Sequence, residues 1–404
     1  MIKNSTKRKC KDGFLNGLTY IFSCIGVIVL FSIIYYVVST GASSLTGSLI
    51  SGDYQEQTYN LRTKEVVTEK FEKVDINGGY YSTSFGVGLK DSTDNEGNNV
   101  VMIYYIHPDS PFNTLVSKSD GTTTQTIKTG YYINKIIMSG ESSSYIYSLA
   151  KDGAEKMVSK MDKANYISDV IIKNGGGGIR GSLLTTLALI GLTLVIALPI
   201  GIMAAIYLHE YAPDNKFKSI IHVMIDMTTG IPSLIFGFVG ALVFIPVLNT
   251  LIGSQGGSIM SGALTMTIIL LPTIIKNTED AFDSIPKSFR ESSLALGASK
   301  NQTIRKVILP NAIPGILTAV LLCIGRIIGE SAALIYAIGT YISDSVIINQ
   351  KSTTLAVHIW SLMQGDNPNY QVSCAISIII LVIVLALSIL VKLISKKLNK
   401  FEVK

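Results

Sequence analysis

Apolar residues gather in six long runs along the chain, separated by polar segments. A helix needs about 20 apolar residues to cross the hydrocarbon layer of a membrane, and each run reaches or approaches that length. The third run is interrupted by Gly230-Ile231-Pro232, and the fifth contains Arg326 and Glu330. We therefore predict a polytopic membrane protein with six transmembrane helices. The runs cover residues 15–38, 183–208, 219–252, 258–275, 312–341 and 372–391.

The first run is long for a signal peptide, whose apolar core is roughly 7–15 residues. We interpret residues 1–40 as an N-terminal segment and a first transmembrane helix that anchors the chain. The main helical part is predicted over residues 179–397, with a short tail at 398–404.

Residues 41–178 lie between the first two predicted spans and are polar enough to form a domain outside the membrane. Two stretches, 100–107 and 126–139, are rich in β-branched and aromatic residues and are predicted strands. The stretch 142–161 is predicted to be helical. The insert is therefore expected to be a small extracytoplasmic α+β domain.

The charge distribution indicates topology rather than a nucleic-acid partner. The chain has 34 Lys+Arg and 28 Asp+Glu, a net charge of +6, and only 15% of its residues are charged. The insert carries 13 basic and 16 acidic residues, or −3, so the remainder carries +9. Lysines and arginines favour the cytoplasmic side of a membrane, and they flank the spans on one side. Both termini of a multi-pass cell-membrane protein are therefore expected in the cytoplasm.

No cofactor, metal or nucleotide site is predicted. The run Gly176–Gly181 fits the pattern GxGxxG, but an uncharged membrane helix follows it where a dinucleotide-binding unit is required. The chain contains no Gly-Lys pair, so it lacks the loop that holds nucleotide phosphates. It also has no CxxC pattern and no clustered histidines. If ATP drives the function, another subunit must bind it.

The polar loop 283–312 between the fourth and fifth runs carries the most informative pattern. It fits E-x5-G-x9-[IV]-x-L-P, with predicted helices over 284–296 and 299–307 and a sharp turn between them. This pattern is similar to the coupling motif of binding-protein-dependent ABC importer permeases, which implies contact with an ATPase. The residues that match or flank it are Glu291, Ser292, Ser293, Leu296, Gly297, Leu309 and Pro310.

Further segments narrow the resemblance to the PstA family of phosphate permeases. They are YLHEYA at 207–212, LPTIIKNTEDA at 271–281 and GRIIGESAAL at 325–334. The resemblance covers about 178–397 and the first span, and does not extend to the insert. It implies the type I (MetI-like) permease fold and a non-catalytic transmembrane subunit. The implied partners are a PstC-like second permease, a PstB-like ATPase dimer, a PstS-like extracytoplasmic phosphate-binding protein and phosphate.

Charged residues inside the spans are the candidates for the substrate pathway, because such charges rarely face lipid. Arg326 and Glu330 are four positions apart and are expected on one helix face, with Arg326 contacting phosphate and Glu330 orienting it. Gly230 and Pro232 are candidates for a hinge. The full set of predicted pathway residues is Arg326, Glu330, Lys276, Glu279 and Ser331.

Several alternatives stay open on the sequence alone. The transported ion could be another oxyanion such as molybdate or sulfate, and less favoured readings are a membrane sensor or a secondary transporter. Asp226, four positions after His222, is interpreted as a cap or packing contact. The outer loop around Trp360 and 364–368 is either a binding-protein contact or an interfacial anchor. The insert could steady a binding protein, cover the partner permease or shield the entrance.

Overall fold

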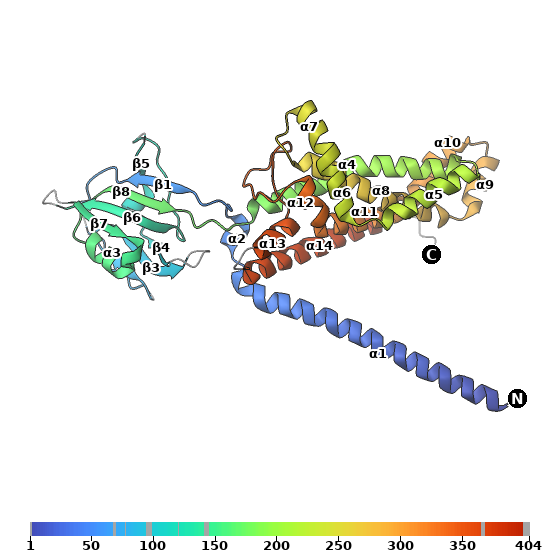
Figure 1. The fold of residues 1–404 in the computed structure, drawn as a ribbon, viewed down its shortest axis with the longest axis horizontal. Coiled ribbons are helices and arrows are strands. Elements are labelled where there is room, and N and C mark those ends of the chain that lie inside the picture. Colours follow the sequence, from blue (N-terminus) through green and yellow to red (C-terminus); the bar gives the residue numbers. More distant parts are fainter. Residues whose placement is uncertain are drawn as a thin grey trace. The chain divides into compact units, whose positions relative to one another are not determined.

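The protein is described here by a computed structural model covering residues 2–67, 70–76, 78–93, 99–119, 121–140, 145–364 and 368–398. The chain divides into two compact units (Figure 1), a sheet unit over Gly52–Gly178 and a helical unit formed by the rest. The sheet unit starts later than the predicted insert, because the short helix α2 (Gly47–Ser51) belongs to the helical unit. There Leu49 clusters with Ile179 and Ile376. Part of the predicted outer loop, 365–367, lies outside the described residues.

The described part of the sheet unit forms one antiparallel sheet of eight strands. The strand order is β2-β3-β4-β6-β8-β1-β5, and β7 pairs with β6. One helix, α3 (Ala154–Met161), accompanies the sheet. The strands are β1 (Thr58–Arg62), β2 (Tyr80–Ser82), β3 (Val87–Thr93), β4 (Asn99–Ile106), β5 (Val116–Ser117), β6 (Tyr132–Ser139), β7 (Tyr145–Leu149) and β8 (Tyr166–Lys173).

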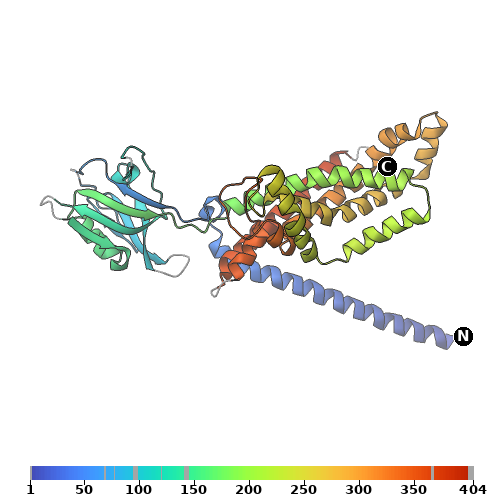
Figure 2. The ribbon, with the colours of Figure 1, turned by 45° about the horizontal axis from the view of Figure 1, so that its top comes forward.

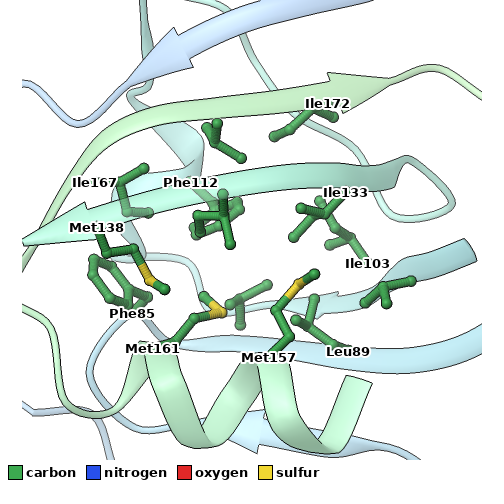
Figure 3. Packing of buried hydrophobic residues seen from close by; sticks show 14 of the residues in the cluster. Phe85, Leu89, Ile103, Phe112, Ile133, Met138, Met157, Met161, Ile167 and Ile172 are labelled. Carbon is green, nitrogen blue, oxygen red and sulfur yellow. The ribbon is translucent and has the colours of Figure 1, made fainter. Parts of the chain in front are cut away.

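The core of the sheet unit lies between α3 and one face of the sheet. Figure 3 shows Met157 and Met161 of α3 pointing toward Phe85, Leu89 and Ile103, and all five side chains are fully buried. Full burial of such a side chain stabilises a fold by about 1.5–3 kcal/mol. The insert therefore has a hydrophobic core of its own, as its length and composition predicted.

The strand and helix predictions for the insert were correct in part. β4 confirms the predicted strand 100–107, but β6 occupies only the second half of 126–139, because Gly130 turns the chain with φ +93°. The helix predicted over 142–161 was wrong for 145–149, which form β7. There Tyr145, Tyr147 and Leu149 are exposed, whereas Ser148 between them is buried, and this period of two fits a strand. Residues 142–144 lie outside the described residues.

Asp152 links the last turn of α3 to the end of β7, and this contact provides a test of the sheet unit. Its carboxylate accepts hydrogen bonds from Lys160 Nζ at 2.8 Å and from the Leu149 N–H and Ser148 Oγ at 3.2 Å. These donors, the Lys160 ammonium first, lower the pKa of Asp152 from 3.8 to about 2. The ionised carboxylate therefore stabilises the folded state above about pH 4, and this contribution is lost as the pH falls toward 2.

We predict that Asp152→Asn removes this part of the acid sensitivity. Hydrogen exchange of residues 145–161 in the full chain should be faster in the variant at neutral pH, and the two proteins should converge near pH 2. A wild-type protein whose difference from the variant stays constant from pH 6 to pH 2 would contradict the assignment.

The described part of the helical unit contains six helical segments that are long and apolar enough to cross a membrane, which confirms the predicted number. They are Asp12–Ser44, Arg180–Tyr211, Ser233–Ile252, Ile259–Asp283, Lys300–Gly329 and Tyr370–Lys397. Besides α2, the helices of this unit are α1 (Ile2–Gly41), α4 (Arg180–Ile206), α5 (Lys216–Thr229), α6 (Ser233–Val239), α7 (Ile245–Ile252), α8 (Ile259–Asp283), α9 (Lys287–Ala295), α10 (Lys300–Thr303), α11 (Leu309–Gly329), α12 (Ala332–Ala337), α13 (Leu355–Met363) and α14 (Tyr370–Leu398), with wider π-helical turns at Tyr207–Tyr211, Gly240–Phe244 and Ile304–Ile308.

α8 is the central helix of the bundle, and 67% of its most apolar stretch of 18 residues is buried. Two glycines let its neighbours approach closely: Gly201 of α4 lies against Ile274, and Gly315 of α11 lies against Ala281. A side chain at either glycine would collide with α8. By contrast α1 meets the bundle only near its C-terminal end, where Gly41 lies against α14 (Figures 1 and 2), and its apolar side chains are otherwise exposed.

Two of the predicted spans are interrupted. The third predicted run, 219–252, consists of α5 and a second helical segment that runs from α6 through α7, because the chain leaves helical geometry at Gly230-Ile231-Pro232. The fifth run, 312–341, is α11 followed by α12, with a break at Glu330 and Ser331. These breaks place irregular backbone beside predicted functional residues.

Candidate functional site

The predicted coupling loop folds into α9, a turn and α10, which we name the coupling segment (residues 286–308). Gly297 takes φ +83°, a conformation that favours glycine and permits the sharp turn. Ser299 then caps α10 by accepting from the N–H of Gln302, whose side chain accepts from the Ser299 N–H. The predicted boundaries need correction. The first helix begins at Lys287 rather than 284 because Pro286 disfavours helical geometry in the residue before it.

The second predicted helix, 299–307, was expected to end before the membrane. Instead α10, the turn Ile304–Ile308 and α11 form one continuous helical segment to Gly329. Pro310 lies just after the π-helical turn Ile304–Ile308 inside this segment; proline cannot donate a helical hydrogen bond, and a local π-helical turn accommodates such an interruption. The coupling segment is thus joined directly to the span that carries Arg326, with Leu309 and Pro310 at the junction.

One ion pair fastens the coupling segment to the end of α4. Arg290 of α9 donates from Nη2 and Nε to Glu210 Oε1, at 3.0 and 3.3 Å, and also to the carbonyls of Phe282 and Ile285. The Glu210 side chain is only 10% exposed and that of Arg290 21%. Such a shielded pair with several hydrogen bonds is stronger than an exposed surface pair. Glu210 belongs to the YLHEYA segment found in the sequence, but its partner Arg290 was not predicted.

The turn Tyr207–Tyr211 that carries Glu210 makes two further attachments. His209 lies between Glu210 and Asp283, with ring nitrogens 3.1 and 3.0 Å from their carboxylate oxygens. Lys300 of α10 donates to the carbonyl of Glu210, and its ammonium lies 5.1 Å from the centre of the Tyr211 ring. The ends of α4 and α8 and both short helices therefore meet at this turn.

The remaining predicted coupling residues divide into two groups. Ser293 faces inward, and its hydroxyl lies 2.9 Å from that of Thr303. Glu291, Ser292, Leu296 and Gly297 are exposed, and Leu296 is 88% exposed. Phe289 and Leu294 extend this surface and are also exposed. An apolar surface of this kind at the end of a membrane bundle is suited to binding another protein.

We predict that Glu210→Gln loosens the coupling segment without unfolding the bundle. Loss of the charged acceptor leaves Arg290 half-buried without its counter-charge, which should cost about 1–3 kcal/mol. Hydrogen exchange of residues 287–298 in the full chain should become faster. The matched control is Asp214→Asn, because the Asp214–Lys218 pair is similar in length at 2.8 Å but Asp214 is 94% exposed. Equal exchange in α9 for both variants would refute the anchoring role.

Arg326 and Glu330, predicted to share a helix face, are separated by the end of α11. Glu330 has an extended backbone, with φ −79° and ψ 121°, and its carboxylate accepts from the Ala333 N–H at 3.1 Å, capping α12. No ion pair joins the two side chains, both of which lie in the described part of the chain. The expectation that Glu330 orients Arg326 from the same helix was therefore wrong, because its carboxylate caps the next helix. Ser331 lies in the break between the two helices.

Lys276 and Glu279 of α8 are each paired with a residue of α5. Lys276 forms an ion pair with Asp226, and the two side chains are 43% and 57% exposed. His222 Nδ1 lies 3.7 Å from Glu279 Oε2. The sequence placed His222 and Asp226 on one face of a helix but could not show their partners, which lie far along the chain.

Gly230 and Pro232 lie where α5 ends and α6 begins. Pro232 has φ −56° and ψ 134°, and its carbonyl accepts from the Ile235 N–H in the first turn of α6. The helix is thus fully interrupted rather than bent. Over the described residues, no three His, Cys, Asp or Glu side chains come together as a metal site.

Comparison with known proteins defines the class of this chain. The family model of the binding-protein-dependent transport system inner membrane component matches residues 197–400, just over half of the chain. The chain therefore belongs to this family, and the predicted MetI-like permease fold, with six membrane helices and an α+β insert, is confirmed.

Individual relatives refine this class. The probable ABC transporter permease protein YqgI of Bacillus subtilis is 36% identical over 200 residues, covering 46% of this chain and 66% of YqgI. The phosphate transport system permease protein PstA homolog of Mycoplasma pneumoniae is 32% identical over 187 residues, covering 46% of this chain and 29% of that protein. The predicted resemblance to PstA proteins is thus confirmed. The matched stretch spans less than two thirds of either relative.

Among solved structures, the inward-facing MetNI methionine ABC transporter is similar, with 22% identity and a TM-score of 0.43. The matched region covers 55% of this chain and 96% of the MetNI chain.

Proposed function

We propose that this chain is the permease subunit of an ATP-driven phosphate importer, forming half of the translocation pathway. The observation that carries the proposal is Arg326. It lies in the membrane-spanning helix α11, its side chain is exposed in the isolated chain, and it forms no ion pair with any residue that the structure describes. An arginine in contact with lipid costs about 2.5–3.5 kcal/mol on insertion scales. Arg326 therefore faces water or another protein in the assembled transporter.

The chemistry of this site suits a small anion. A guanidinium offers planar, paired donors that match the oxygens of phosphate. The break at Glu330 and Ser331 follows directly, and irregular backbone at membrane depth is tolerated where it lines a cavity. Lys276 and Glu279 lie further along the proposed pathway. The relatives named as phosphate transport permeases support phosphate as the ion.

The coupling segment supports an ATPase partner. Its exposed apolar residues Phe289, Leu294 and Leu296 form a surface that a PstB-like ATPase dimer would cover. The anchor at Glu210 and the continuous segment into α11 would then transmit ATPase motion to the pathway. The chain itself would be non-catalytic. A PstC-like permease would complete the pathway, and a PstS-like protein would deliver phosphate from outside.

The proposed topology follows from the basic residues. Lysines and arginines of the coupling segment and of the end of α14 would lie in the cytoplasm, together with both termini. The sheet unit would then lie outside the cell membrane, on the side from which phosphate arrives. Gly230 and Pro232 would serve as the hinge at which α5 moves relative to α6.

We predict that Arg326→Ala reduces phosphate uptake at least about tenfold, because a charge-assisted contact of about 1.5–3 kcal/mol is lost. Uptake of radiolabelled phosphate by the assembled transporter is the measurement, and co-purification of the subunits shows that assembly survives. Lys392→Ala, at an exposed position of α14 outside the coupling segment, is the matched control and should transport normally. Normal uptake by the Arg326 variant would remove this residue from the pathway.

We also predict that Gly297→Pro uncouples ATP hydrolysis from uptake. Proline fixes φ near −65° and cannot adopt the +83° of Gly297, so α9 and α10 must reorient. Gly253→Pro is the matched control, because Gly253 has φ +67° at the end of α7 and likewise has no neighbour within 4 Å. ATP hydrolysis per transported phosphate should rise in the Gly297 variant alone. An unchanged ratio in both variants would contradict the coupling role.

A further inference from the structure

The two pairs between α5 and α8 form a cluster of alternating charge. His222 and Asp226 are four positions apart on α5, and Lys276 and Glu279 are three positions apart on α8. Each carboxylate faces a basic group on the other helix: Asp226 pairs with Lys276, and Glu279 with His222. We name these four residues the α5–α8 cluster. Its members differ in exposure, from 13% for Glu279 to 57% for Asp226.

Two members of the cluster, Lys276 and Glu279, lie inside the candidate membrane-spanning segment Ile259–Asp283, toward the end that leads into the coupling segment. α8 has 25 residues, so it is about 37 Å long and exceeds the hydrocarbon layer of about 30 Å. Lys276 is seven positions from the end of α8 at Asp283, or about 10 Å along the helix. Half-exposed charges at this depth must face water or protein rather than lipid. The exposed side of the Lys276–Asp226 pair is therefore open to an aqueous pathway or to a partner subunit.

The cluster lies at a different level of the bundle from Arg326. α11 runs antiparallel to α8: Ala281 packs with Ile316 in one apolar cluster, and Leu270 with Ile324 in the next. The close approach of Gly315 to Ala281 sets the register and places Arg326 about level with Leu270. Lys276 is six positions further along α8, about 9 Å from that level. An ion that leaves Arg326 toward the coupling segment would meet the cluster next.

The mixed charges of the cluster distinguish among oxyanions. Phosphate at neutral pH keeps at least one P–OH group, so it can accept from Lys276 and donate to Asp226 at the same time. Sulfate at the same pH carries no proton, so Asp226 can only repel it. A site selects by such a repulsive element as much as by attraction. Arsenate has the protonation pattern of phosphate and should behave as phosphate does.

Building on the proposed function, we propose that the α5–α8 cluster is a second anion-binding site, which accepts protonated oxyanions, with Asp226 as the specificity-determining residue. Lys276 exchanges its ion pair with Asp226 for the arriving anion, and the anion's own hydroxyl satisfies Asp226. Glu279, held by His222, keeps a second negative charge one turn away and adds to the exclusion of fully deprotonated anions.

Chemical modification of Lys276 tests this directly. The assembled transporter, without a binding protein, is treated with a small amine-acetylating reagent, and modification of each lysine is followed by mass spectrometry. Phosphate and arsenate should slow modification of Lys276 several-fold, and sulfate should not. In Asp226→Asn, sulfate should protect Lys276 as phosphate does. Lys351, an exposed lysine outside α5 and α8, is the internal reference, and Asp214→Asn, which removes the exposed partner of Lys218, is the control variant.

Two outcomes would overturn the proposal. One is equal protection of Lys276 by sulfate and phosphate in the wild-type complex. The other is absence of protection by phosphate in a complex that transports phosphate. The second outcome requires that the same complex takes up phosphate. Failure of the proposed second anion-binding site is therefore distinguishable from failure of the phosphate-importer assignment.

Discussion

The cost of placing charge in hydrocarbon is the constraint on which this structure depends. It explains why only 15% of the residues are charged and why the six apolar runs together contain just three charged residues, Asp226, Arg326 and Glu330. The few charges at membrane depth must be paired or must face water. Lys276 and Asp226 pair with each other, whereas Arg326 finds no ion-pair partner among the described residues. The two proposed anion-binding sites therefore differ in that Lys276 has an ion-pair partner within the chain, whereas Arg326 has none among the described residues.

The same bundle needs a mechanical connection to whatever drives it. The turn Tyr207–Tyr211 provides that connection, because Glu210 holds Arg290 and His209 reaches Asp283. Within the coupling segment, α10 begins a helical segment that continues into α11 without a break until Gly329. A displacement of the coupling segment would therefore reach the helix that carries Arg326, while the end of α4 acts as the fixed point. The breaks at Gly230–Pro232 and at Glu330–Ser331 are the places where the remaining helices can yield.

The sequence predicted the elements that depend on local composition. Apolar runs located all six spans, and the polar length of the insert predicted a separate domain with its own core. Gly297 predicted the turn in the coupling segment because a positive φ strongly favours glycine. The insert's helix was predicted too long, because the alternation of exposed Tyr147, buried Ser148 and exposed Leu149 indicates a strand only once β6 is paired with it.

The failures concern contacts between distant residues. No local signal shows that Glu330 accepts a hydrogen bond from the Ala333 N–H where α11 ends, since apolar residues continue on both sides of Glu330. Likewise, nothing near His222 or Asp226 indicates Glu279 or Lys276. Charged pairs across helices depend on how the helices pack, and a single sequence carries no record of that packing.

The central claim is that this chain serves an ATP-driven phosphate importer. Its most direct test is uptake of radiolabelled phosphate into liposomes that contain the complete transporter, with ATP supplied to the ATPase subunits. The account predicts ATP-dependent uptake that unlabelled phosphate suppresses and that excess sulfate or molybdate leaves unchanged. ATP-dependent accumulation of sulfate or molybdate, with no uptake of phosphate, would contradict it.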